Sequence, residues 1–86
     1  MTANDVVITG IGLVSCLGEG TDAHWSVLSS GNAKAVFDGE RFAPYTVHPL
    51  PQLDWSQQIP KRGDQRQMET WQRLGTYTAG LALADA

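Results

Sequence analysis

The hydrophobic pattern at the start of the chain predicts a buried strand that leads into a loop. Residues 6–9 (Val-Val-Ile-Thr) are β-branched, and their apolar positions do not alternate with polar ones. A run of this kind is typical of a strand covered on both faces, as in the parallel sheet of a layered α/β fold. Residues 10–20 are rich in glycine, so they predict a loop after the strand.

The next segment has the polar and apolar spacing of a short helix. Thr21 is placed to cap it, and Asp22 would face the positive end of the helix dipole. Trp25 and Leu28 lie three positions apart, on one face of the helix. Gly31 is placed to end it, because glycine readily adopts the left-handed conformation common after a helix.

The middle of the chain predicts extended or turning segments rather than a long helix. All four prolines lie between residues 32 and 60, and each removes a backbone donor and restricts the residue before it. Residues 45–48 are predicted to form an edge strand.

A second helix is predicted from Asp64 to the end of the chain. Asp64 and Gln67 have the spacing of a capping box at its start. Apolar or small residues then recur every three or four positions and mark a buried face: Met68, Trp71, Leu74, Thr78 and Leu81. Residues 78–86 have almost no polar face, so this end of the helix is predicted to be enclosed on several sides. The remaining residues are too few to enclose it, and a larger fold is expected.

The composition is that of an ordinary soluble globular protein and excludes several classes. The chain has 86 residues, of which 42% are hydrophobic and 17% charged, so intrinsic disorder is not expected. No apolar stretch is long enough to span a membrane, and the apolar run near the N-terminus lacks the basic residues of a secretory signal. A cytoplasmic protein is therefore expected. The single cysteine, Cys16, excludes an intramolecular disulfide.

Charge is unevenly distributed along this mildly acidic chain. Residues 61–73 contain most of its basic side chains: Lys61, Arg62, Arg66 and Arg73. This group is too small for the broad positive field of a nucleic-acid-binding surface, and an acidic protein partner fits it better. The alternative is a solvated helix start in which Arg73 pairs with Glu69.

The glycine-rich loop approximates a dinucleotide-binding fingerprint. Gly10, Gly12 and Ser15 have the spacing of a GxGxxG motif after a strand, but serine replaces the third glycine. Gly18 and Gly20 continue the loop where the fingerprint would already have begun its phosphate-binding helix. A structural turn is therefore favoured over nucleotide binding, and no cofactor is expected.

Cys16, His24 and His48 form no recognisable catalytic or metal site. A packed small side chain is favoured for Cys16, since nothing in the spacing requires His24 to approach it. The spacings among the three residues match no compact metal-ligand motif, so no metal site is predicted. His24 is expected to be exposed on its helix, and His48 is expected to lie in a loop.

Two segments of the sequence resemble one enzyme family. VVITGIGLVSCLGEGTDAHWSVLSSG, residues 6–31, closely resembles the N-terminal strand, loop and first helix of the elongating, type II β-ketoacyl-acyl carrier protein synthases. KRGDQRQMETWQRLGTYTAGLALADA, residues 61–86, resembles a helix of the same family. The residues in its characteristic positions are Arg66, Met68, Glu69 and Trp71.

The resemblance implies the fold and the reaction of the parent enzyme. Residues 1–86 would be the N-terminal strand-helix portion of a ketosynthase domain, an α/β protein with a thiolase-like layered αβαβα fold that is incomplete in this chain. The parent would be a homodimeric acyltransferase of fatty-acid or related lipid synthesis. In that family a cysteine takes the acyl chain from the carrier, and two histidines assist decarboxylative condensation with malonyl-carrier. No residue of this chain occupies one of those three positions, so no catalytic residue is assigned and the 86-residue chain alone is expected to be inactive.

The resemblance also implies an acyl carrier protein as partner. In the family, the start of the second helix presents basic side chains to an acidic helix of the carrier, and Arg66 occupies one of those positions. Neighbouring basic positions of the family are Gly63 and Gln67 here, and Lys61 and Arg62 are expected to compensate. Two alternatives remain open: a non-catalytic, ketosynthase-like chain-length factor and, less favoured, a Rossmann-type nucleotide-binding module.

Overall fold

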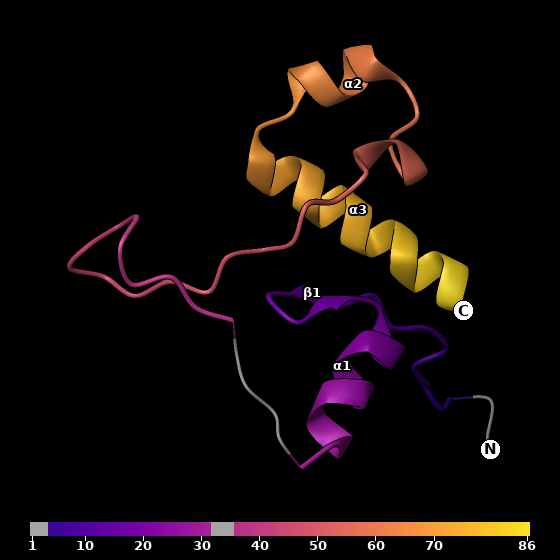
Figure 1. Ribbon diagram of the computed structural model, residues 1–86. Helices are drawn as coiled ribbons and strands as arrows, with labels where there is room; N and C mark the ends of the chain where they lie inside the picture. Colours follow the sequence, from indigo (N-terminus) through magenta and orange to yellow (C-terminus); the bar gives the residue numbers. More distant parts are fainter. Residues whose placement is uncertain (1–3, 32–35) are drawn as a thin grey trace.

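The computed structural model describes residues 4–31 and 36–86, which form a mixed α/β arrangement (Figure 1). The elements in chain order are strands β1 (Val14–Ser15) and β2 (Gly18–Glu19), helix α1 (Thr21–Ser29), the 3₁₀ helix η1 (Trp55–Gln57), and helices α2 (Arg62–Gln67) and α3 (Thr70–Asp85). Of the predicted fold class, the mixed content of helices and strands is confirmed. The sheet of the described residues is a two-stranded antiparallel hairpin, in contrast to the parallel sheet predicted.

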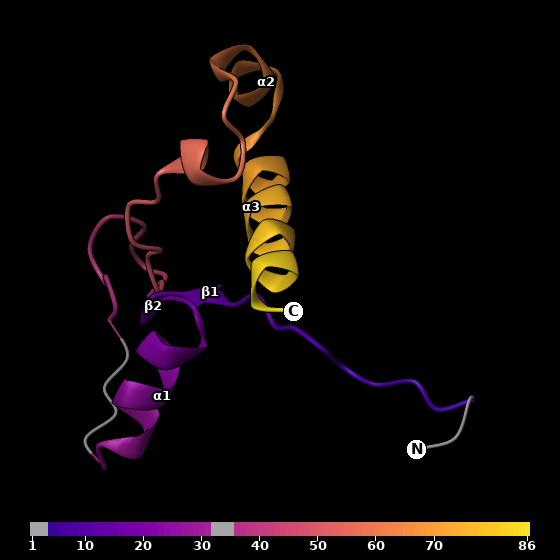
Figure 2. The ribbon, with the colours of Figure 1, turned by 90° about the vertical axis from the view of Figure 1, so that its right-hand side faces the viewer.

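The strand predicted at residues 6–9 is not formed. This segment runs as an extended chain away from α3, and Val6 is 97% exposed (Figure 2). A strand needs a neighbouring backbone with which to exchange hydrogen bonds, and no other described segment pairs with residues 6–9. The prediction is therefore wrong here because the β-branched pattern identifies a strand-forming segment without supplying its partner.

Helix α1 confirms the predicted position of the helix but not its predicted cap. Gly20, with φ of 90°, is the N-cap, and no side chain bonds to the free N–H groups of the first turn. Thr21 is the first helical residue, so its predicted capping role is wrong. Asp22 lies in the first turn as predicted, and Gly31 follows the helix with φ of 76°, the left-handed conformation expected there.

Residues 36–54, which precede η1, form a long loop closed by a β-bridge between Asp38 and Val47. The backbones of Asp38 and Val47 exchange two hydrogen bonds, of 2.8 and 2.9 Å. The Asp38 side chain also accepts hydrogen bonds from the N–H groups of Arg41 and Glu40, and these bonds lower the pKa of that carboxyl. The edge strand predicted at residues 45–48 is thus reduced to a single bridge.

The long C-terminal helix predicted from Asp64 is two helices. Asp64 lies in the first turn of α2, and the chain leaves the helical conformation at Met68. Glu69 then begins α3 with a capping box: its side chain accepts from the backbone of Gln72, and the Gln72 side chain accepts from the Glu69 N–H at 2.7 Å. The capping box predicted at Asp64 is wrong because the same acidic-to-glutamine spacing recurs five residues later and is used there.

The small core lies where α3 meets η1 and the hairpin. Tyr77 is fully buried, Ile59 is the other buried apolar residue in the described part of the chain, and the Trp55 ring meets Tyr77 edge-on at 5.7 Å. Trp71, predicted to face inward, is 72% exposed. Leu74, Thr78 and Leu81 of the predicted face are half-buried, and Tyr77 rather than Trp71 anchors α3.

The arrangement is flat and open. Its accessible surface is 6865 Å², against about 5,000 Å² for a compact protein of this mass. Its radius of gyration is 16.0 Å, against about 12 Å for a compact domain of this length. Large apolar side chains remain on the surface, among them Val6, Ile8, Trp25, Leu28 and Leu83. No helix in the described part of the chain is long and apolar enough to cross a membrane.

Candidate functional site

The three residues predicted to bind a partner lie together at α2. Lys61 is the N-cap of this helix, Arg62 is its first residue, and Arg66 lies in its last turn. All three are exposed. Arg62 and Arg66 are four positions apart, so they lie on the same face of the helix. We call Lys61, Arg62 and Arg66 the basic patch.

A hollow of about 480 Å³ adjoins the basic patch. It is lined by Trp55 from η1, by Arg62, Gln65 and Arg66 from α2, and by Arg73 from α3. We call it the arginine hollow. Sequence reasoning grouped Arg73 with the other basic residues, and the turn between α2 and α3 brings it to the same cavity.

Arg73 does not form the ion pair with Glu69 that belonged to the alternative of a solvated helix start. Its Nε donates to the backbone oxygen of Gln65 at 2.8 Å, while the Glu69 side chain caps α3. Gln65 in turn donates from its side-chain nitrogen to the backbone oxygen of Ile59 at 2.7 Å. These bonds hold α2 against the buried Ile59, which follows η1, and hold Arg73 at the wall of the hollow.

The guanidinium groups of this site lack acidic partners. Within residues 4–31 and 36–86, no carboxylate forms an ion pair with Arg62, Arg66 or Arg73. Opposite charge from outside this part of the chain would therefore be attracted to the site.

The glycine-rich loop packs against α3 instead of surrounding an open phosphate site. A Cβ atom at Gly12 would overlap the backbone oxygen of Thr78, and one at Gly10 would overlap that of Ala82. The glycines thus allow two backbones to approach closely. Helix α1 begins only at Thr21, so its N-terminus does not follow Gly12 as a dinucleotide fingerprint requires. The geometry favours the structural turn over nucleotide binding.

His24 is buried, so the prediction of an exposed histidine is wrong. Its Nδ1 lies 2.7 Å from the backbone oxygen of Gly20, and its Nε2 lies 2.6 Å from the Ser15 hydroxyl. Because a carbonyl oxygen only accepts, the hydrogen is assigned to Nδ1, and neutral Nε2 then accepts from Ser15. The hydrogen bonds of His24 therefore tie the start of α1 to the hairpin, which sequence spacing did not indicate.

Cys16 and His48 are not drawn into a common site. Cys16 lies half-buried in the turn between β1 and β2, where the sequence predicted a packed side chain. His48 bonds through Nδ1 to the backbone oxygen of Val36 at 2.8 Å. No group of three or more His, Cys, Asp or Glu side chains among the described residues is placed to hold a metal ion.

Sequence reasoning missed a partly buried polar contact between α3 and the hairpin. The Tyr77 hydroxyl donates to Glu19, with the Gln57 side-chain oxygen at 3.2 Å as a further acceptor. Burial, and next the hydrogen bond to Glu19, raise the pKa of Tyr77 to about 12. The spacing of Tyr77 three residues after Leu74 was the one available signal that it shares the inner face of α3.

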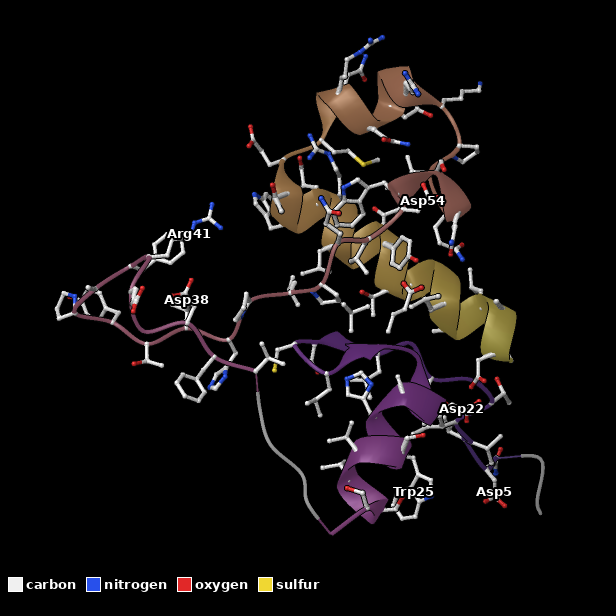
Figure 3. The ribbon with its side chains drawn as sticks, viewed as in Figure 1. Asp5, Asp22, Trp25, Asp38, Arg41 and Asp54 are labelled. Carbon is white, nitrogen blue, oxygen red and sulfur yellow. The ribbon has the colours of Figure 1, made fainter. Side chains whose placement is uncertain are left out.

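Two further hollows carry fewer charges. One of about 660 Å³ is lined by residues 50–55 and Thr70, with Asp54 as its acidic member; Figure 3 shows Asp54 beside η1. The other, of about 420 Å³, lies on α1 beside His24 and Trp25.

Comparison of the chain with protein-family models, with curated proteins and with solved structures gives no match. The functional assignment therefore depends on the residues and their geometry, among which the basic patch and the arginine hollow are the most distinctive.

Proposed function

We propose that the chain is the N-terminal part of a β-ketoacyl-acyl carrier protein synthase and that its basic patch docks the acyl carrier protein. The observation that carries the proposal is the exposure of Arg62 and Arg66 on one face of α2, with no acidic partner in the described part of the chain. An acidic carrier helix would supply carboxylates to these guanidinium groups through charge-assisted hydrogen bonds.

The packing of the two family-like segments on each other supports the proposal. Gly10 and Gly12 belong to the first segment and meet the backbone of α3, which belongs to the second. The Ile11 N–H also donates to the Asp85 carboxylate at 2.9 Å. A side chain at either glycine would prevent this approach, so the glycines of one segment are required by the contact with the other.

The exposed residues 6–9 also agree with the proposal. In a layered αβαβα fold this segment would be an inner strand, paired with strands from the rest of the domain. Its β-branched composition and its exposure are the properties expected of a strand whose pairing strands lie elsewhere in the domain.

The proposed role of this segment is docking rather than chemistry. In the parent enzyme a cysteine would receive the acyl chain and two histidines would promote decarboxylation of malonyl-carrier. Cys16 lies in a hairpin turn, and both imidazoles bond to nearby backbone oxygens. We therefore assign none of the three catalytic roles to Cys16, His24 or His48.

A chimera tests the proposal. Residues 1–86 replace the equivalent segment of a β-ketoacyl-acyl carrier protein synthase, whose remaining sequence supplies the cysteine and both histidines. We expect a soluble dimer that condenses acyl and malonyl carriers. Arg66→Glu should raise KM for the acyl carrier about tenfold or more, with a larger effect at low salt, and should leave self-acylation from acyl-CoA nearly unchanged.

Arg41→Glu is the matched control. Arg41 is also exposed but lies on the loop closed by Asp38, away from α2 (Figure 3). Arg41→Glu should leave both KM for the acyl carrier and self-acylation from acyl-CoA unchanged. A chimera that is insoluble, or that folds without condensation, would contradict the family assignment. Equal effects of Arg66→Glu on acyl carrier and acyl-CoA would contradict the docking role.

A further inference from the structure

The arginine hollow combines three cations with an aromatic wall in a space of ligand size. Its volume of about 480 Å³ is within the range of about 300 to 1,000 Å³ typical of small-molecule sites. The guanidinium groups come from Arg62, Arg66 and Arg73, and the indole comes from Trp55. A flat docking surface for a protein helix does not need such a cavity.

The inner wall of the hollow is fixed by the core. Trp55 packs edge-on against the buried Tyr77, and Gln65 is held by its bond to Ile59. Arg73 donates from Nε to Gln65, so its two terminal nitrogens keep their donors for a ligand. Trp55 and Arg73 are thus positioned before any ligand arrives.

The outer rim carries two more guanidinium groups on α2. Arg62 and Arg66 are exposed and, like Arg73, form no ion pair within residues 4–31 and 36–86. Like charges around one cavity repel each other, and an anion that binds among them removes this repulsion. Guanidinium groups match phosphate oxygens with paired N–H donors, and they do so better than point charges such as lysine.

We propose that the arginine hollow binds the diphosphate group of a small phosphorylated ligand. Arg73 binds one phosphate at the inner wall, and Arg62 and Arg66 close over the other from the rim. The cavity is larger than a single phosphate ion requires, and Trp55 offers a face to an organic group attached to the diphosphate.

This inference has one consequence that rests on the proposed function. Arg62 and Arg66 belong both to the basic patch and to the arginine hollow, so a bound diphosphate would compete with the acyl carrier protein. Lys61 belongs only to the patch, and Arg73 only to the hollow.

The test titrates the 86-residue chain with inorganic pyrophosphate and follows the indole N–H signals by NMR. The Trp55 signal should shift saturably, whereas the signal of Trp25, on the distant helix α1, should not (Figure 3). Sodium chloride at matched ionic strength should give no saturable shift. Adenosine diphosphate forms the second arm: equal affinity would show that the diphosphate alone is recognised, and tighter binding would show that Trp55 also contacts the organic group.

Variants separate this site from carrier docking. Arg66→Gln and Arg73→Gln should each weaken pyrophosphate binding about tenfold or more. Lys61→Gln and Arg41→Gln should leave it unchanged. Arg66 makes no side-chain hydrogen bond to any other described residue, so Arg66→Gln tests the site even where Arg73→Gln disturbs α2.

Carrier docking is measured separately in the chimera. There, Lys61→Gln should weaken carrier docking and Arg73→Gln should not, so failure of one proposal is distinguishable from failure of the other. The diphosphate site is overturned if the Trp55 indole signal does not shift with pyrophosphate. It is also overturned if the Trp25 indole signal shifts equally.

Discussion

The hydroxyl of Tyr77 donates a hydrogen bond to Glu19, 58 residues earlier in the chain. This contact joins α3 to the hairpin in front of α1, and Tyr77 is the one fully buried side chain among the described residues. The two segments that resemble one enzyme family are thus joined by this contact, by the Ile11–Asp85 hydrogen bond and by the close approach of the Gly10–Gly12 loop to α3. Removal of the Tyr77 hydroxyl should weaken their association.

Tyr77→Phe should destabilise the chain by about 1 to 2 kcal/mol, since it removes the hydrogen bonds to Glu19 and Gln57 while keeping the ring against Trp55. Tyr77→Ala should cost about 3 to 5 kcal/mol because it also removes the ring from the core. Urea unfolding followed by circular dichroism measures both. Tyr45→Phe, at an exposed tyrosine, is the control and should change stability by less than about 0.5 kcal/mol.

Stability should also depend on pH through Tyr77. The fold raises the pKa of this phenol from 10.0 to about 12, so the folded state holds the proton more tightly than the unfolded state. The stabilisation is complete below pH 10 and is lost as the pH rises toward about 12. Unfolding free energies measured across this window should fall more steeply for the native chain than for Tyr77→Phe. Parallel curves would show that Tyr77 does not titrate with folding.

Local signals predicted the helices better than the contacts between them. Asp22 and Gly31 marked α1 correctly because helix termini depend on neighbouring residues. The start of α3 was missed because two capping-box patterns, at Asp64 and at Glu69, have the same spacing. Which pattern is used depends on how α2 packs on Ile59, which no local pattern encodes.

The candidate site was likewise predicted only in part from the sequence. Lys61, Arg62 and Arg66 were visible as a cluster of charge in the sequence. The hollow was not, because it requires α2 to turn back at Met68 and bring Arg73 beside Trp55. The strand predicted at residues 6–9 failed for a related reason: strand pairing is non-local, and the pattern specifies only one of the two partners.

Gly12→Ala should be strongly destabilising, because the new Cβ would overlap the Thr78 backbone, which cannot move without disturbing α3. We expect a loss of about 1 to 3 kcal/mol in unfolding free energy. Gly75→Ala is the matched control within α3. Open space surrounds Gly75, so this change should stabilise the helix by about 0.5 to 1 kcal/mol. Equal effects of the two substitutions would contradict the close approach of the loop to α3.

His24 and Cys16 should differ in how much each contributes to stability. His24→Ala should destabilise the chain by about 1 to 3 kcal/mol, because it removes a buried ring and leaves the Ser15 hydroxyl and the Gly20 carbonyl without their partner. Cys16→Ser should cost less than about 1 kcal/mol, since Cys16 is only half-buried in its turn and a hydroxyl there can reach water. In the chimera, Cys16→Ser should also leave the covalent acyl-enzyme intact, as detected by mass spectrometry of the intact protein. Loss of the acyl adduct in a folded Cys16→Ser chimera would identify Cys16 as the nucleophile and overturn its assignment as a packing residue.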